Sequence, residues 1–174
     1  MNDPSATPGG GDAATVAAVA TPEGAIDLQL PPPLEDEFLD SLTGTWRGVL
    51  RLGGVEFEAT NEVGWILNRQ FVLGRNRAVS ALGVGESQEL WQRTAEARVY
   101  KLWWADAWGN AGIAECRPTA GGWTIAGNDP LVGGFRNTIL RTAPDELAIV
   151  QESGPDASGA FTRIGDGHLR RTQT

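Results

Sequence analysis

The chain has 174 residues and a mass of 18.5 kDa, enough for one domain with a hydrophobic core. Residues 1–40 contain eight acidic residues and no Lys or Arg, whereas residues 41–174 contain 14 acidic and 14 basic residues. The net charge of −8 therefore lies entirely in the first part of the chain. A neutral body without a basic patch argues against nucleic acid or an anionic membrane as a partner.

Residues 1–33 are rich in Ala, Pro, Gly and Thr and end in three consecutive prolines. Such a composition buries too little apolar surface to order itself, so we predict a flexible acidic leader over 1–33 and a folded domain over 34–174. The alternative is a lid or docking segment that uses Ile26, Leu28 and Leu30. The sequence shows no signal peptide and no apolar run of 18 residues, so we expect a cytoplasmic protein.

Residues 34–42 are expected to form a short helix that caps one end of the fold, because Leu34, Phe38 and Leu42 fall on one helical face. From Trp46 onward hydrophobic residues recur at every second position, which is typical of half-buried strands. Turn residues such as those in 165–167 separate the expected strands, and the spacing predicts an all-β sandwich or barrel. The expected strands cover residues 46–52, 55–65, 69–80, 87–94, 97–105, 111–117, 122–127, 133–142, 146–153, 159–164 and 167–172.

The short helix followed by Gly44, Thr45 and Trp46 forms a Gly-x-Trp motif that resembles the start of lipocalin-like (calycin) barrels. The resemblance implies an antiparallel meander β-barrel of about ten strands, a short N-terminal capping helix and an interior of small-molecule size, without implying a particular chemistry. In lipocalins a late Arg stacks over this Trp, a role that falls here to Arg170 or Arg171. Five further stretches are similar to a bacterial family of these barrels: 65–71, 90–93, 100–104, 121–125 and 168–171.

Aromatic residues on the expected inner faces are the first candidates for ligand contacts. If Tyr100 and Trp104 face inward, they form an aromatic wall of a pocket, and Trp103 lies outside or in an interface such as that of a homodimer. Phe57 and Trp65 belong to the inward alternation of their strand and are further candidates. The alternative is that these side chains fill a small barrel completely.

Arg75 and Arg77 share one face of their strand and are also candidate ligand contacts. If this face is inward, their guanidinium groups require an anionic partner in an apolar interior. That partner is either a ligand carboxylate or an internal acid such as Glu89, Glu115 or Glu152. In the alternative register, the intervening residues face inward and both Arg side chains lie in solvent.

These patterns predict non-enzymatic binding of a small hydrophobic or aromatic ligand, with no cofactor and no metal, since one Cys and one His are too few for structural zinc. One alternative is an isomerase- or cyclase-like enzyme that uses Tyr100, Asp106 or an inward Arg as an acid or base. Another is a heme- or nitric-oxide-binding barrel, similar to nitrobindins, with His168 as the iron ligand. Cys116 is expected to be a small buried hydrophobic residue rather than a nucleophile. No catalytic motif is present, so no catalytic residue is assigned.

Overall fold

The computed structural model describes residues 19–20, 26–27, 29–131, 133–156 and 159–172. The chain forms two compact units, Met1–Pro32 and Pro33–Thr174. In the first unit, β1 (Val19–Ala20) and β2 (Ile26–Asp27) form an antiparallel pair. Most of the predicted leader, including Leu28 of the alternative lid, lies outside the described residues.

The helix α1 (Glu37–Leu42) opens the folded part of the second unit. It begins later than predicted because the Asp36 carboxylate accepts a hydrogen bond from the Leu39 backbone N–H at 3.0 Å and so caps the first turn. Leu39 and Leu42 are buried in the core, which confirms that the helix is amphipathic. Within the described ranges, no helix combines the length and the apolar character required to cross a membrane.

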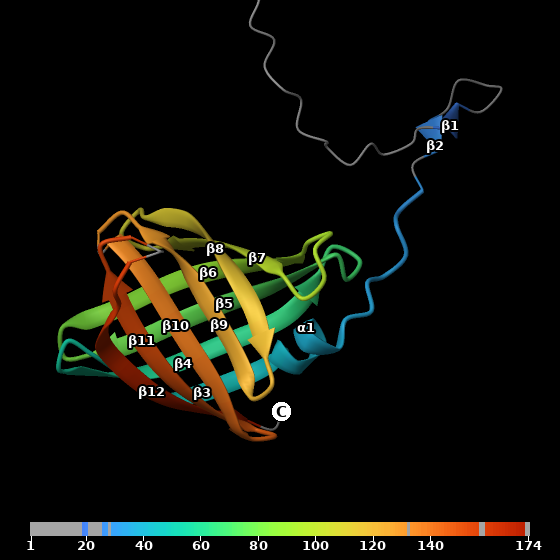
Figure 1. Cartoon of the computed structure of the whole chain (residues 1–174). Coiled ribbons are helices and arrows are strands. Elements are labelled where there is room, and N and C mark those ends of the chain that lie inside the picture. Colours follow the sequence, from blue (N-terminus) through green and yellow to red (C-terminus); the bar gives the residue numbers. More distant parts are fainter. Residues whose placement is uncertain (1–18, 21–25, 28, 132, 157–158, 173–174) are drawn as a thin grey trace, which may run out of the picture. The chain divides into compact units, whose positions relative to one another are not determined.

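Ten antiparallel strands then form a closed barrel, as predicted (Figure 1). Consecutive strands pair with each other, and the last strand pairs with the first to close the ring. The strands are β3 (Gly44–Leu52), β4 (Val55–Ile66), β5 (Phe71–Ser80), β6 (Gly83–Arg93), β7 (Tyr100–Asp106), β8 (Ala111–Thr119), β9 (Gly122–Asp129), β10 (Gly133–Ala143), β11 (Glu146–Gly154) and β12 (Thr162–Thr172).

The two ends of the barrel differ because successive strands run in opposite directions. The helix α1 leads directly into β3 and packs against the end of the barrel where β3 begins, here called the α1 end (Figure 1). The turns that follow β3, β5, β7 and β9 lie at the opposite end, here called the open end.

Trp46 closes the α1 end, as the Gly-x-Trp motif predicts. Its side chain is 2% exposed, and its indole Nε1 donates to the Leu42 carbonyl at 2.9 Å. The Arg171 guanidinium lies 4.5 Å from the centre of the Trp46 ring, a cation–π contact. Of the two expected partners, Arg171 is therefore the stacking residue, whereas Arg170 pairs with Glu146 on the surface.

The predicted turn at residues 165–167 is wrong, because β12 runs through it without interruption. Gly165 and Gly167 face the neighbouring strand so closely that an added Cβ would lie 2.3 Å from the Arg51 carbonyl oxygen and 2.3 Å from Leu50 Cδ2, respectively. Glycine permits this close approach of two strands. The expected strands at 159–164 and 167–172 are thus one strand, and the barrel has the ten strands that the resemblance implies.

Candidate functional site

A cavity of about 320 Å³ lies between the core at the α1 end and the open end, and it opens to solvent beside Trp108 and Glu86. This volume lies at the lower limit of the range that small-molecule sites usually occupy, roughly 300–1,000 Å³. A smaller void of about 50 Å³ adjoins Leu42 and Trp46 and shares several lining residues with the cavity. The apolar lining includes Leu50, Trp91, Ile125, Ile139, Ile149 and Leu169.

Polar side chains interrupt this apolar lining on three adjacent strands, β4, β5 and β6. Asn61 faces Asn76, and Asn76 faces Ser87, so the three side chains form a row across the sheet. The Asn76 amide donates to the Ser87 hydroxyl at 3.2 Å. Glu89 lies two residues further along β6, opposite Gly74, and accepts hydrogen bonds from Asn76 and Trp91. These residues form one polar wall of the cavity.

Glu89 is a half-buried carboxylic acid in the lining of the cavity. Its removal from water raises the pKa of Glu89, and the hydrogen bonds from Asn76 and Trp91 lower that pKa to a smaller extent. Among the described residues, no basic side chain contributes to this shift. The cavity thus contains an acidic group without a cationic partner, which is costly in an apolar interior and is frequent at functional sites.

A second polar wall lies across the barrel, because β10 is five strands away from β5 in a ring of ten. Asn137 on β10 pairs with Gln151 on β11, and both line the cavity. Within the described part of the chain, the Gln151 Oε1 and Asn61 Oδ1 atoms are enclosed but have no hydrogen-bond partner. Each wall therefore presents an acceptor to the cavity that the protein itself leaves unused.

Trp108 lies at the open end, in the turn between β7 and β8, and also lines the cavity. Its side chain is 71% exposed, yet the ring packs so closely over Gly85 that a Cβ added there would lie 2.7 Å from it. Asp106 holds this turn, since its carboxylate accepts hydrogen bonds from the Trp108 and Asn110 backbone N–H groups at 2.9 Å. The proposed acid–base role of Asp106 is not favoured, because its carboxylate stabilises the turn.

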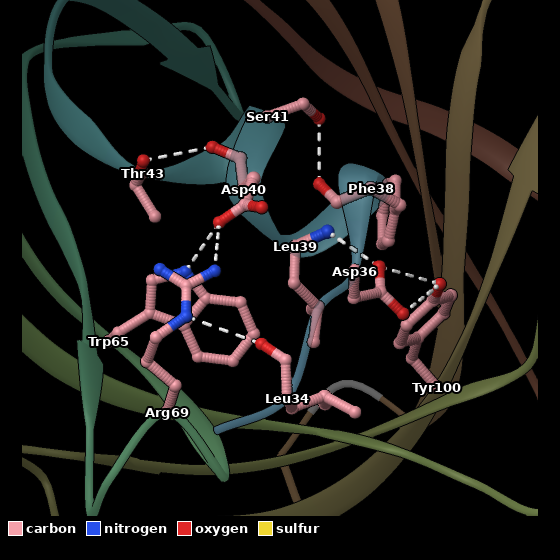
Figure 2. A network of polar contacts seen from close by, with 10 residues as sticks. All are labelled: Leu34, Asp36, Phe38, Leu39, Asp40, Ser41, Thr43, Trp65, Arg69 and Tyr100. Atoms are coloured by element: carbon pink, nitrogen blue, oxygen red, sulfur yellow. Dashed lines mark hydrogen bonds and ion pairs between the residues drawn. The ribbon is translucent and has the colours of Figure 1, made fainter. Parts of the chain in front are cut away.

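Two of the predicted ligand contacts, Tyr100 and Trp65, instead fasten α1 to the barrel (Figure 2). The Tyr100 hydroxyl donates to the Asp36 carboxylate at 3.0 Å, and burial raises the pKa of Tyr100. The Trp65 indole and the Arg69 guanidinium both donate to Asp40 Oδ1 at 2.7 Å, which lowers the pKa of Asp40. Neither Tyr100 nor Trp65 lines the cavity, so their interaction partner is the helix.

Trp104 and Phe57 face the interior as predicted, but neither contributes to the cavity lining. Trp104 packs edge-to-face against Phe135 with ring centres 6.3 Å apart, and an added Cβ at Gly112 would lie 2.8 Å from its ring. Trp103 alternates with Trp104 and lies on the outer face beside Leu90 and Ile113. The predicted register of this strand is correct, and Trp104 fills space that a ligand would otherwise occupy.

Arg75 and Arg77 lie on the outer face of the barrel, so the inward alternative for both residues is wrong. Their strand places them beside Glu62 and Thr60, whereas Gly74, Asn76 and Ala78 face the interior. Arg77 also forms an ion pair of 3.6 Å with Glu86. Both Arg side chains are exposed and line a second pocket of about 690 Å³, and Arg77 also contributes to the lining of the 320 Å³ cavity. Their cationic groups are solvated there instead of buried.

His168 and Cys116 do not provide the chemistry that was considered for them. The His168 side chain is 55% exposed on the outer face of β12, 3.8 Å from Glu146, so it does not reach the cavity as an iron ligand. Heme held inside the barrel by His168 therefore does not fit this structure. Cys116 is fully buried, and this burial raises the pKa of its thiol, which disfavours the nucleophilic thiolate.

The sequence matches no family model and no curated protein. Among solved structures, Rv2717c from M. tuberculosis matches with a TM-score of 0.62 and 13% identity, over 78% of this chain and 95% of its own. The S-type phycobiliprotein lyase CPES from Guillardia theta matches with a TM-score of 0.58 and 11% identity, over 79% of this chain and 92% of its own. The chain shares the barrel fold of these proteins. At such low identity the similarity concerns the fold and not the ligand.

Proposed function

We propose that the protein binds a small, predominantly apolar or aromatic ligand inside the barrel, without catalysing a reaction. The observation that carries this proposal is the cavity of about 320 Å³ in the barrel, which opens to solvent and whose lining combines aliphatic and aromatic side chains with a few convergent polar groups. A barrel whose only task was stability would gain by filling this space, because each unfilled volume lowers the free energy of unfolding. The binding residues of this proposal are those of the cavity lining.

The remaining parts of the proposal concern partners and location. The outer apolar surface of Trp103, Leu90 and Ile113 is the expected contact of a homodimer, since Ile113 is 57% exposed. A cytoplasmic location, and the absence of nucleic acid and membrane partners, remain predictions from the sequence.

A variant that fills the cavity tests the proposal. Ala78 lies on the inner face of β5 and lines the cavity, so Ala78→Leu adds three carbon atoms inside it. We expect the affinity for naphthalene, measured by equilibrium dialysis, to fall at least about tenfold, because the ligand and the new side chain compete for the same volume. Ala105→Leu makes the same change on the outer face of β7 and is the matched control.

The two variants give opposite expected results. The proposal requires that Ala105→Leu binds naphthalene as the unmodified protein does, and that both variants retain a cooperative thermal transition. Equal affinity of Ala78→Leu and the unmodified protein would place the binding site outside the cavity. Absence of naphthalene binding to the unmodified protein would count against binding of this class of ligand altogether.

Glu89 favours one second candidate, an enzyme that isomerises or cyclises an apolar substrate. A carboxyl group whose pKa is raised inside a cavity can donate a proton to a bound molecule. Tyr100 and Asp106, the acid or base residues expected from the sequence, are engaged with Asp36 and with the turn at Trp108. Incubating a compound extracted from the protein with fresh unmodified protein, followed by chromatography, distinguishes the candidates, since a binder returns the compound unchanged whereas an isomerase or cyclase interconverts substrate and product.

A further inference from the structure

We propose that the cavity selects an organic amine, whose amino group binds beside Gly74 between the side chains of Asn61 and Glu89. This inference rests on the proposed function and specifies the class of ligand. Three features of the cavity support it: the hydrogen-bond acceptors that have no partner, the carboxyl group of Glu89, and the space left by the missing side chain of Gly74.

Two enclosed acceptors of the cavity lining have no hydrogen-bond partner among the described residues. The Asn76 amide donates to Ser87 and Glu89, and the Trp91 indole donates to Glu89. Asn61 Oδ1 and Gln151 Oε1 are enclosed acceptors without a partner among the described residues. A buried acceptor that stays unpaired costs about 1–3 kcal/mol. The complementary ligand is therefore one that brings N–H donors.

Gly74 provides the space for such a donor group. A Cβ added at Gly74 would lie 3.6 Å from Asn61 Oδ1 and 3.6 Å from Glu89 Oε2. Two acceptors from adjacent strands thus converge on the space above one glycine. An amino group packed against Gly74 has several N–H bonds to direct at these two oxygens, whereas a carbonyl or ether oxygen of a ligand has none.

The charge of the cavity favours an amine over an alcohol or an acid. Glu89 has no basic partner among the described residues, and an ammonium group beside it would pair with its carboxylate form and offset the burial that raises its pKa. The indole rings of Trp91 and Trp123 line the same cavity and attract a cation through their faces. An anionic ligand would gain no opposite charge from Glu89, and it would bring further acceptors to the unpaired oxygens of Asn61 and Gln151.

Four compounds with one ring system test the proposal by equilibrium dialysis at neutral pH. They are naphthalene, 1-naphthylmethylamine, 1-naphthalenemethanol and 1-naphthoate. We expect the amine to bind at least about tenfold more tightly than the alcohol, because hydrogen bonds to charged groups contribute about 1.5–3 kcal/mol and 1.4 kcal/mol is a tenfold change in affinity. Naphthoate is expected to bind most weakly.

Two variants locate the amino group. Glu89→Gln retains the shape and removes the charge, so the amine is expected to bind no more tightly than the alcohol, with naphthalene unchanged. Gly74→Ala places a methyl group in the space above Gly74 at ordinary contact distance, and is expected to weaken amine binding at least about tenfold more than naphthalene binding. Gly64→Ala on the same sheet, where an added Cβ meets nothing within 4 Å, is the matched control.

The outcomes separate this inference from the function on which it rests. Equal binding of amine and alcohol to the unmodified protein, or an unchanged amine affinity in Glu89→Gln, would overturn the amine proposal while naphthalene binding upholds the cavity as a binding site. Tight binding of naphthoate would also overturn it. Binding of none of the four compounds would refute the proposed function and this inference together.

Discussion

Replacing Trp46 by alanine is expected to lower the free energy of unfolding by about 3–5 kcal/mol, the usual cost of removing a large buried aromatic side chain. The Trp46 side chain is 2% exposed and belongs to the same core cluster as Leu39 and Leu42 of α1. Its loss also removes the hydrogen bond to the Leu42 carbonyl and leaves the Arg171 guanidinium without the ring it covers. Urea denaturation monitored by far-UV circular dichroism measures the effect.

Trp108→Ala is the matched control for this substitution, because it deletes the same side chain at the open end, where Trp108 is 71% exposed. Trp108→Ala is expected to lower the free energy of unfolding by less than about 1 kcal/mol, since exposed side chains contribute little to stability. A cost below about 1 kcal/mol for Trp46→Ala would contradict the role of Trp46 as the plug of the α1 end.

The second large effect is expected in the pH dependence of stability, through Glu89. Its pKa in the folded protein lies above the ordinary value of 4.5, so the folded state keeps the proton at pH values where the unfolded chain has lost it. The contribution of Glu89 to stability is therefore lost as the pH rises from about 4.5 to the raised pKa. Each unit by which the pKa is raised lowers the stability above this range by about 1.4 kcal/mol.

The Glu89→Gln variant has no carboxyl group to titrate at this position. As the pH rises over the same range, the free energy of unfolding of the variant is therefore expected to fall less than that of the unmodified protein. Urea denaturation at a series of pH values measures both curves. Cys116 faces the same region, but its pKa is raised above 9.0 and does not interfere. Glu86→Gln on the exposed side of β6 is the control. Parallel curves for Glu89→Gln and the unmodified protein would show that Glu89 is not desolvated.

Much of the architecture could be predicted because alternation of hydrophobic residues directly encodes a barrel wall. The run from Val55 to Trp65 alternates without interruption, and β4 forms there (Figure 1). The stacking of a late Arg over Trp46 followed from the resemblance to lipocalin-like barrels. The glycines did not distinguish turns from strands. Gly165 and Gly167 are compatible with a turn and equally with a close contact between two strands, and only the position of the neighbouring strand shows which of these occurs.

The cavity could not be predicted in the same way. Residues 86–89 read Glu-Ser-Gln-Glu, so no alternation shows that Glu89 faces inward and Gln88 outward. Asn61 stood in an inward position of a clear strand, and this buried amide was the one signal that sequence reasoning could have used. Tyr100 and Trp65 face inward as well, but their polar atoms bind Asp36 and Asp40 of the α1 region. Which aromatic residues line a cavity depends on where α1 docks.

The seven tryptophans allow the most direct test of ligand binding inside the barrel. Their indole N–H groups give separate signals in a proton–nitrogen correlation spectrum, and naphthalene can be titrated into labelled protein. We expect the signals of Trp91, Trp108 and Trp123, which line the cavity, to shift with naphthalene concentration. The signals of Trp65, bound to Asp40, and of Trp103, on the outer face, should stay in place. Shifts confined to Trp65 or Trp103 would contradict a binding site inside the barrel.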